Sequence, residues 1–259
     1  MRTSNKLFTP KSSILEKEVA NQFELSEYIG KTLILSRKVF IRRLSLIALL
    51  LIFFSVLGQY YRYFYNEGAE RYLTYMFNLD EETNFPTYFS TILLIFSSIL
   101  TLLISSSKHK TKERYSVNWY IISLVLLLMS MDEILMLHEQ VSAPIRTLLH
   151  TQGFFYFAWL LPAAILIITF LISNINLFFS LPPRFQKSFF IASLIYFIGA
   201  FLMEMVGGKF LSFYGQNNFG YAIITTIEES FELVGLIILL NSLLSYCKDE
   251  LPNLSIKLE

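Results

Sequence analysis

Apolar residues along the chain gather into long runs that are separated by short polar segments. A helix needs about 20 apolar residues to cross the hydrocarbon core of a bilayer, and six runs are of this order. The predicted spans are Leu44–Tyr61, Pro86–Ser107, Val117–His138, Phe154–Ile175, Ser188–Val206 and Tyr221–Tyr246. The pattern therefore predicts an all-α fold, a polytopic membrane helix bundle with six transmembrane helices over residues 44–246.

The segments outside the predicted spans are polar, with two exceptions. Within the N-terminal segment 1–43, apolar residues recur every four positions over Ile14–Leu33. This spacing fits an amphipathic helix on a membrane surface as well as it fits a flexible tail with chance spacing. The segment Tyr60–Tyr88 is rich in tyrosine, which prefers the membrane–water boundary. We expect this loop to lie along the interface, with a short helix near Ala69–Phe77.

Lysine and arginine near the ends of the predicted spans indicate the orientation of the chain, because cytoplasmic loops are enriched in these residues. They gather before the first span, between the second and third, and between the fourth and fifth: Lys31, Arg37, Lys38, Arg42, Arg43, Lys108, Lys110, Lys112, Arg114, Arg184 and Lys187. The loop after the first span is acidic instead. We therefore expect both termini, including the tail 247–259, to be cytoplasmic.

The composition supports a membrane protein. The chain has 259 residues, of which 54% are hydrophobic and 16% are charged, whereas soluble domains carry roughly a quarter charged residues. The net charge of +1 comes without a basic face or a nucleic-acid-binding motif, so we expect no nucleic-acid partner. Cys247 is the only cysteine, which excludes an intrachain disulfide and a cysteine-based zinc cluster.

Seven acids and one histidine interrupt the apolar runs, and only in the third, fifth and sixth spans. They are Asp132, Glu133, His138, Glu139, Glu204, Glu228, Glu229 and Glu232. In the predicted topology the three spans bring these residues to one layer in the outer half of the bilayer. Charges at this depth are costly, and no lysine or arginine lies there. Arg146 and Lys209, just beyond the helix ends, could pair with one or two acids, so the others must be protonated, hydrated or bound to cations.

Helical spacing suggests which acids share a centre. Asp132 and Glu139 are seven residues apart and are predicted to lie on one face of the third span, flanked by Glu133 and His138. Oxygen ligands with one imidazole suit a divalent iron, manganese or zinc ion, and less often calcium. The predicted metal ligands are Asp132, His138, Glu139, Glu204, Glu228 and Glu232. A carboxylate beside the metal, Glu133 or Glu229, is the predicted catalytic proton acceptor.

Simpler interpretations exist for single residues. Glu139 and Glu204 lie near the ends of their predicted spans and could be interfacial acids, and His138 could be a hydrated interfacial histidine. Neutral acids can also form hydrogen bonds between helices. Glu228 and Glu232 are four residues apart and are predicted to lie well inside the membrane, so an interfacial position explains these two acids least well.

Three short elements carry a resemblance to known sequences. They are MDEILMLHE (131–139), GAFLMEMVGG (199–208) and TTIEESFELVG (225–235). In order and spacing they resemble elements of a group of uncharacterised bacterial multipass membrane proteins. The resemblance covers about the C-terminal half of the chain and implies the bacterial cytoplasmic (inner) membrane as its location, but no activity.

Three classes of function remain open. The first is a metal-dependent membrane enzyme that acts on a lipid-phase or periplasmic substrate. The second is a proton- or cation-coupled transporter or channel, since acids in membranes also form proton relays and cation sites. The third is a membrane sensor or assembly subunit. The acids lie in one half of the bilayer only, which favours an enzyme or a sensor over a conduit. In each case the expected partners are membrane lipids and a metal cation or protons.

Overall fold

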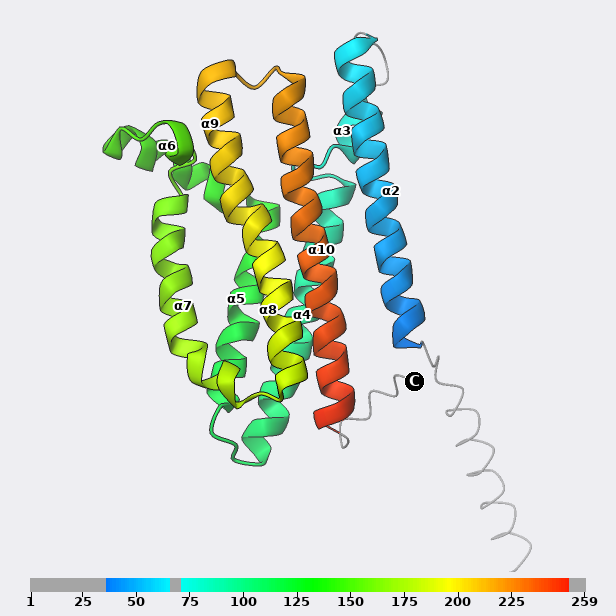
Figure 1. Cartoon of the computed structure of the whole chain (residues 1–259), viewed down its shortest axis with the longest axis vertical. Helices are drawn as coiled ribbons and strands as arrows, with labels where there is room; N and C mark the ends of the chain where they lie inside the picture. The colour runs from blue at the N-terminus through cyan, green and yellow to red at the C-terminus, as the bar shows by residue number, and fades with distance from the viewer. Residues whose placement is uncertain (1–35, 66–70, 252–259) are drawn as a thin grey trace, which may run out of the picture. The chain divides into compact units, whose positions relative to one another are not determined.

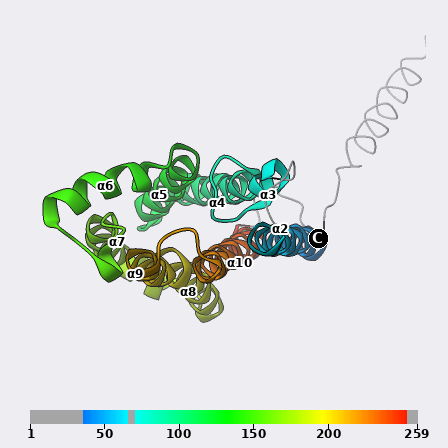
Figure 2. The ribbon, with the colours of Figure 1, turned by 90° about the horizontal axis from the view of Figure 1, so that it is seen from above.

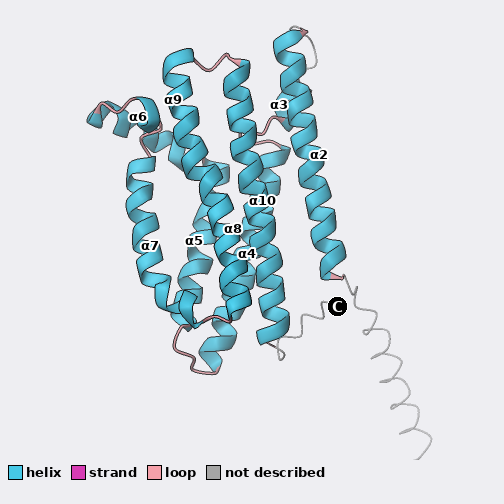
Figure 3. Ribbon diagram, in the orientation of Figure 1, coloured by secondary structure: helices cyan, strands magenta, loops and turns pink. Residues whose placement is uncertain are grey.

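The structure, a computed structural model, describes residues 36–65 and 71–251 of the chain. Every regular element in these residues is helical (Figure 3), which confirms the predicted all-α fold. The possible amphipathic helix Ile14–Leu33 lies outside the described residues. The elements are α2 (Arg37–Phe64), α3 (Arg71–Phe77), α4 (Phe85–Lys110), α5 (Ser116–Leu135), α6 (Leu137–Leu149), the 3-10 turn η1 (Gly153–Phe155), α7 (Leu160–Ser180), α8 (Pro183–Phe197), the π-helix η2 (Ile198–Met203), α9 (Glu204–Tyr214) and α10 (Phe219–Glu250).

Five helices of the described chain are long and apolar enough to cross a membrane. They are α2, α4, α5, α7 and the continuous helix Pro183–Tyr214 that joins α8, η2 and α9. The sixth predicted span corresponds to α10, which has 32 residues and is about 48 Å long at 1.5 Å per residue. The structure thus supports a multipass membrane protein, while six crossings and their orientation stay predictions. The short helix expected near Ala69–Phe77 is confirmed as α3.

The third predicted span, Val117–His138, is wrong at its end. Helix α5 stops at Leu135, and Met136 adopts a left-handed conformation with φ 52° before α6 begins. The carboxylate of Asp132 accepts a hydrogen bond from the backbone N–H of His138 at 3.0 Å, which satisfies a donor at the start of the new helix. The spacing predicted that Asp132 and Glu139 lie on one face of one helix. This prediction is wrong, because Asp132 lies on α5 and Glu139 lies on α6.

Three other predicted spans need new boundaries. The helix of the first, α2, begins at Arg37 rather than at Leu44. The fourth begins at Leu160 rather than at Phe154, because the 3-10 turn Gly153–Phe155, whose Gly153 has φ 61°, and the bends and turn over residues 156–159 precede the helix. The fifth extends at both ends, from Pro183 to Tyr214, and contains a π-helical segment in its middle.

The helices form two rows when the bundle is seen along its axis (Figure 2). One row contains α4 and α5, and the other contains α8, α9 and α10. Serine side chains join α4 to α5, with Ser98 Oγ donating to the carbonyl of Ser123 at 2.8 Å. Between α8 and α10 the backbones approach so closely that a Cβ on Gly235 would lie 2.8 Å from the backbone nitrogen of Tyr196.

The two ends of the bundle differ in charge. Helix α2 begins, and α10 ends, at the end that also carries the α4–α5 loop and the α7–α8 turn (Figure 1). Most of the lysines and arginines used to predict the orientation lie there, so we term it the basic end. Arg184 forms ion pairs with Asp249 at 3.2 Å and with Glu250 at 3.1 Å, which joins α8 to α10. Helix α6 lies at the opposite end.

Candidate metal centre

A cavity of about 370 Å³ lies toward the α6 end of the bundle, and acidic side chains line it. Its walls come from the loop before α4, from α5 and α6, from the connection 150–159 between α6 and α7, from the continuous helix of α8, η2 and α9, and from α10. Nine carboxyl groups line the cavity: Asp80, Glu82, Asp132, Glu133, Glu139, Glu204, Glu228, Glu229 and Glu232. The structure thus brings all seven predicted acids together, with His138, around one cavity.

Two of the nine acids were missed from the sequence. In the sequence, Asp80 and Glu82 enter the prediction only as negative charges of the loop after the first span, which help to indicate the orientation. In the structure the side chain of Asn84 caps α4 and donates to the carbonyl of Tyr75 at 3.0 Å. The hydroxyl of Tyr75 donates in turn to the carbonyl of Glu82 at 2.7 Å. These bonds hold the loop between α3 and the start of α4. The one signal in the sequence was the Asn-Phe-Pro helix start directly after the acids.

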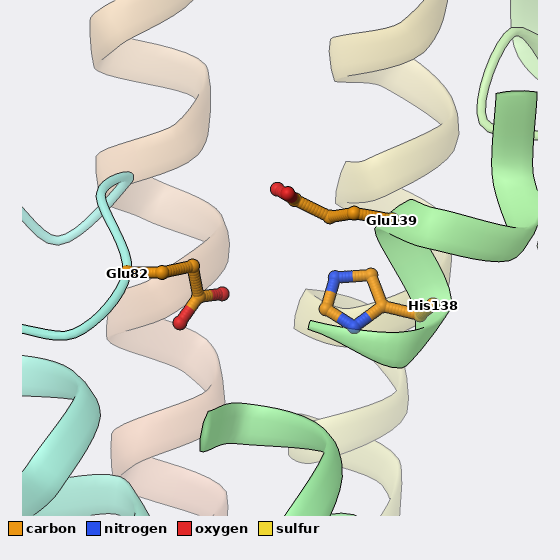
Figure 4. A group of neighbouring side chains, drawn as sticks. All are labelled: Glu82, His138 and Glu139. Carbon is orange, nitrogen blue, oxygen red and sulfur yellow. The ribbon is translucent and has the colours of Figure 1, made fainter. Parts of the chain in front are cut away.

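Three side chains lie close enough together that they could hold a metal ion (Figure 4). Glu82, His138 and Glu139 each offer one ligand atom, and these atoms all lie within 4.8 Å of one another. The Nδ1 atom of His138 is 2.8 Å from Oδ2 of Asp132, so this nitrogen is already occupied. The other ring nitrogen, Nε2, points toward the two glutamates. A carboxylate that holds the distal side of an imidazole in this way is typical of metal-binding histidines.

An aromatic ring also contacts the imidazole of His138. The rings of His138 and Trp159 lie 5.2 Å apart, and the indole Nε1 of Trp159 donates to Oε1 of Glu204 at 3.0 Å. Glu204, which we predicted as a ligand, therefore holds the aromatic wall of the cavity in the structure. Asp132, also predicted as a ligand, holds His138 through both of its oxygens.

The deeper acids come mainly from α10. Glu228 is only 6% exposed, and in the described chain none of the ion pairs involves Glu228, Glu229 or Glu232. Glu133 faces them from α5, and its Oε2 accepts a hydrogen bond from the hydroxyl of Ser90 at 2.6 Å.

The π-helix η2 brings the opposite wall close to these acids. A Cβ on Gly199 would lie 2.7 Å from the carbonyl oxygen of Glu228 and 2.9 Å from Cγ of Glu232. Only a residue without a side chain permits this approach. Isolated π-helical turns are frequent at functional sites, because the widened turn changes the direction in which the following side chains point.

The basic side chains near the cavity do not neutralise its acids. The guanidinium of Arg146 lies 4.2 Å from the ring centre of Tyr156 and donates to the carbonyl of the same residue. The ammonium of Lys209 lies 4.4 Å from the ring centre of Phe154. The ion pairs found among residues 36–65 and 71–251 join neither residue to a cavity acid, so the pairing that the sequence allowed at the helix ends is not among them.

Charge and burial shift the pKa values of three groups that line the cavity. Burial, with the neighbouring charges of Glu81 and Glu204, raises the pKa of Asp80 to about 7. Burial and the charge of Glu133 raise the pKa of Glu82 to about 7 as well. For His138, burial alone would lower the pKa, but the hydrogen bond and charge of Asp132 raise it to about 9. The cavity therefore attracts positive charge.

Comparison with known proteins places the chain in a family but assigns no activity. Residues 41–247 match the family described as Domain of unknown function (DUF8692), and the chain belongs to this family. The match contains every helix from α4 to α9 and most of α2 and α10. No curated protein and no solved structure matches the chain.

Proposed function

We propose that the protein is a metal-dependent membrane enzyme that binds a divalent iron, manganese or zinc ion through Glu82, His138 and Glu139. The observation that carries the proposal is the convergence of the three ligand atoms within 4.8 Å, with the imidazole held in place by Asp132. An acidic cluster alone would not suffice, because exposed acids gather in many proteins. The oriented imidazole is the feature that favours a metal.

The donor set fits this chemistry. Two carboxylates and one imidazole suit the three proposed metals, and three protein ligands leave a coordination position open for water or substrate. The bound metal would supply Lewis acidity or redox chemistry at that position. The negative charge that favours a proton on His138 also favours a divalent cation, so metal binding should release protons.

The remaining acids have supporting roles in this proposal. Glu133 and Glu229 stay the candidates for the proton acceptor, since both line the cavity beside the proposed site. Glu204, Glu228 and Glu232 line the same cavity and stay candidate ligands of the ion or of a second cation. The substrate is expected to come from the lipid phase or from the outer aqueous side.

The packing of the basic end supports an enzyme over a transporter. There the ring of Trp119 from α5 lies 5.1 Å from that of Tyr246 on α10 and 6.1 Å from that of Phe189 on α8. A transporter needs a polar route through this end of the bundle, and large aromatic side chains occupy it. A proton- or cation-coupled transporter is the alternative, and a membrane sensor or assembly subunit is the third possibility.

Elemental analysis of the detergent-purified protein tests the proposal. We expect stoichiometric iron, manganese or zinc in the natural protein and none in His138→Ala. His109→Ala is the matched control, because His109 is exposed at the end of α4 and should leave the metal content unchanged. Asp132→Asn should weaken metal affinity about 10- to 100-fold, as loss of a supporting carboxylate does elsewhere.

Two results would contradict the proposal that the protein is a metal-dependent enzyme. One is a metal-free natural protein that takes up no iron, manganese or zinc when these are supplied in excess. The other is pH-dependent ion flux in liposomes that survives His138→Ala, which would favour transport.

A further inference from the structure

Helix α6 does not follow the direction of the spans. It begins after the left-handed Met136, ends before the left-handed His150, and runs crosswise to the spans at the edge of the bundle, beside α5 and α7 (Figures 1 and 2). A helix in this position either stands in water, covers a partner, or lies along a membrane surface.

The two faces of α6 differ in chemistry. One face lines the cavity with His138, Glu139, Ser142, Ala143 and Arg146. At 3.6 residues per turn, the opposite face presents a narrow apolar stripe, defined by Leu137, Val141, Pro144 and Leu148. All four residues are exposed, with Leu137 and Val141 at 45% and Leu148 at 77%. An amphipathic pattern of this kind is typical of helices that lie in a membrane interface.

The connection after α6 leads to an exposed apolar surface on α7. Residues 150–159 connect α6 directly to α7, whose sides are exposed and apolar at Ile165, Leu166 and Ile172. The connection itself exposes Phe154 and Phe155, and aromatic residues are common where a helix bundle meets the headgroups.

We propose that α6 is an interfacial helix whose apolar stripe rests among the glycerol and upper acyl groups of lipids in the leaflet at the α6 end. The lipid surface then covers the stripe while the opposite face closes the cavity. This inference goes beyond the proposed function and does not depend on a bound metal. Its consequence is that the cavity opens at the level of the lipid headgroups rather than in bulk water.

Site-specific fluorescence in nanodiscs tests the position of α6. Leu148→Cys is made in a Cys247→Ser background and labelled with an environment-sensitive dye. Ile172→Cys in the middle of α7, 68% exposed, marks the hydrocarbon core, and Asn217→Cys in the exposed α9–α10 loop marks water. The nanodiscs contain phosphatidylcholine brominated either near the carbonyl end or near the methyl end of its acyl chains.

We expect the dye at position 148 to lose more fluorescence to bromines near the carbonyl end, and the dye at position 172 to lose more to bromines near the methyl end. Val141→Cys should give the same result as position 148. Because position 141 lies away from the last turn of α6, fraying of that turn could not explain the agreement. Quenching of position 148 by aqueous iodide as strong as that of position 217 would overturn the proposal. Protection from both bromine and iodide would also overturn it, because the stripe would then be buried against a second copy of the chain.

Discussion

Gly199 controls the distance between the π-helix η2 and the acid-bearing part of α10, and Gly199→Ala tests how tightly this contact is packed. The added Cβ would lie 2.7 Å from the carbonyl oxygen of Glu228, 2.9 Å from Cγ of Glu232 and 3.1 Å from the nitrogen of Glu232. Two of these three atoms belong to the backbone, which cannot rotate away. The helices must therefore separate by several tenths of an ångström.

The size of the effect follows from two opposing terms. Overpacking in a well-packed interior costs about 1–3 kcal/mol. Replacing glycine by alanine within a helix contributes up to about 1 kcal/mol in the other direction. Gly207→Ala isolates the second term, because a Cβ there meets its nearest neighbours at 3.7 Å, an ordinary contact. Both glycines lie in the continuous helix Pro183–Tyr214, so the pair is closely matched.

The assay is the midpoint of thermal unfolding in detergent, measured with the metal content of each variant. We expect the thermal midpoint of Gly199→Ala to lie below that of Gly207→Ala, by about 2–4 °C for each kcal/mol by which their free energies of unfolding differ. Because the shift moves Glu228 and Glu232, the metal content of Gly199→Ala should also fall. If Gly199→Ala is as stable as Gly207→Ala and binds the same amount of metal, the reasoning from this contact is wrong.

Three further predictions address single features. Glu232→Gln should lower the metal content of inserted, folded protein if Glu232 is a ligand, and unchanged metal content together with unchanged ion flux would remove both functional roles. In a cysteine-free background, an impermeant thiol reagent should label intact cells at Asn66→Cys and not at Lys110→Cys, and the reverse pattern would overturn the predicted topology. Metal-free protein should lose stability as the pH rises, because Asp80 and His138 bind protons more tightly in the folded state than in the unfolded state. The contribution of Asp80 to the free energy of unfolding is lost between its ordinary pKa of 3.8 and about 7. The contribution of His138 is lost between 6.5 and about 9. A thermal midpoint that rises from about pH 5 to about pH 9 would contradict the last prediction.

The sequence predicts the helices of this protein well because long apolar runs dominate it. It also predicts that the acids of the third, fifth and sixth spans meet, since their depth follows from chain direction and helical rise alone. The structure supports this gathering by placing all seven around one cavity. Their roles as ligands or proton acceptors stay predictions.

The detail of the candidate site depends on tertiary contacts that no local pattern reveals. Met136 is neither glycine nor asparagine, and methionine is a good helix former, so the residue type at this position does not predict a helix break. The break depends on Asp132, whose carboxylate binds both the backbone and the ring of His138. Glu82 was missed for a similar reason: a loop acid reaches the site only because Tyr75 and Asn84 hold the loop in place.

The order of the ligands along the chain has a consequence for biogenesis. Glu82 directly precedes the α4–α5 hairpin, and His138 and Glu139 directly follow it. The three proposed ligands Glu82, His138 and Glu139 are therefore encoded within residues 82–139, and α7, α8, α9 and α10 are synthesised later. A ribosome that has released this hairpin into the membrane has already delivered all three ligand atoms. If these three residues bind an ion, as proposed, they are available to bind it before the later helices are inserted, and insertion of those helices would then enclose the ion.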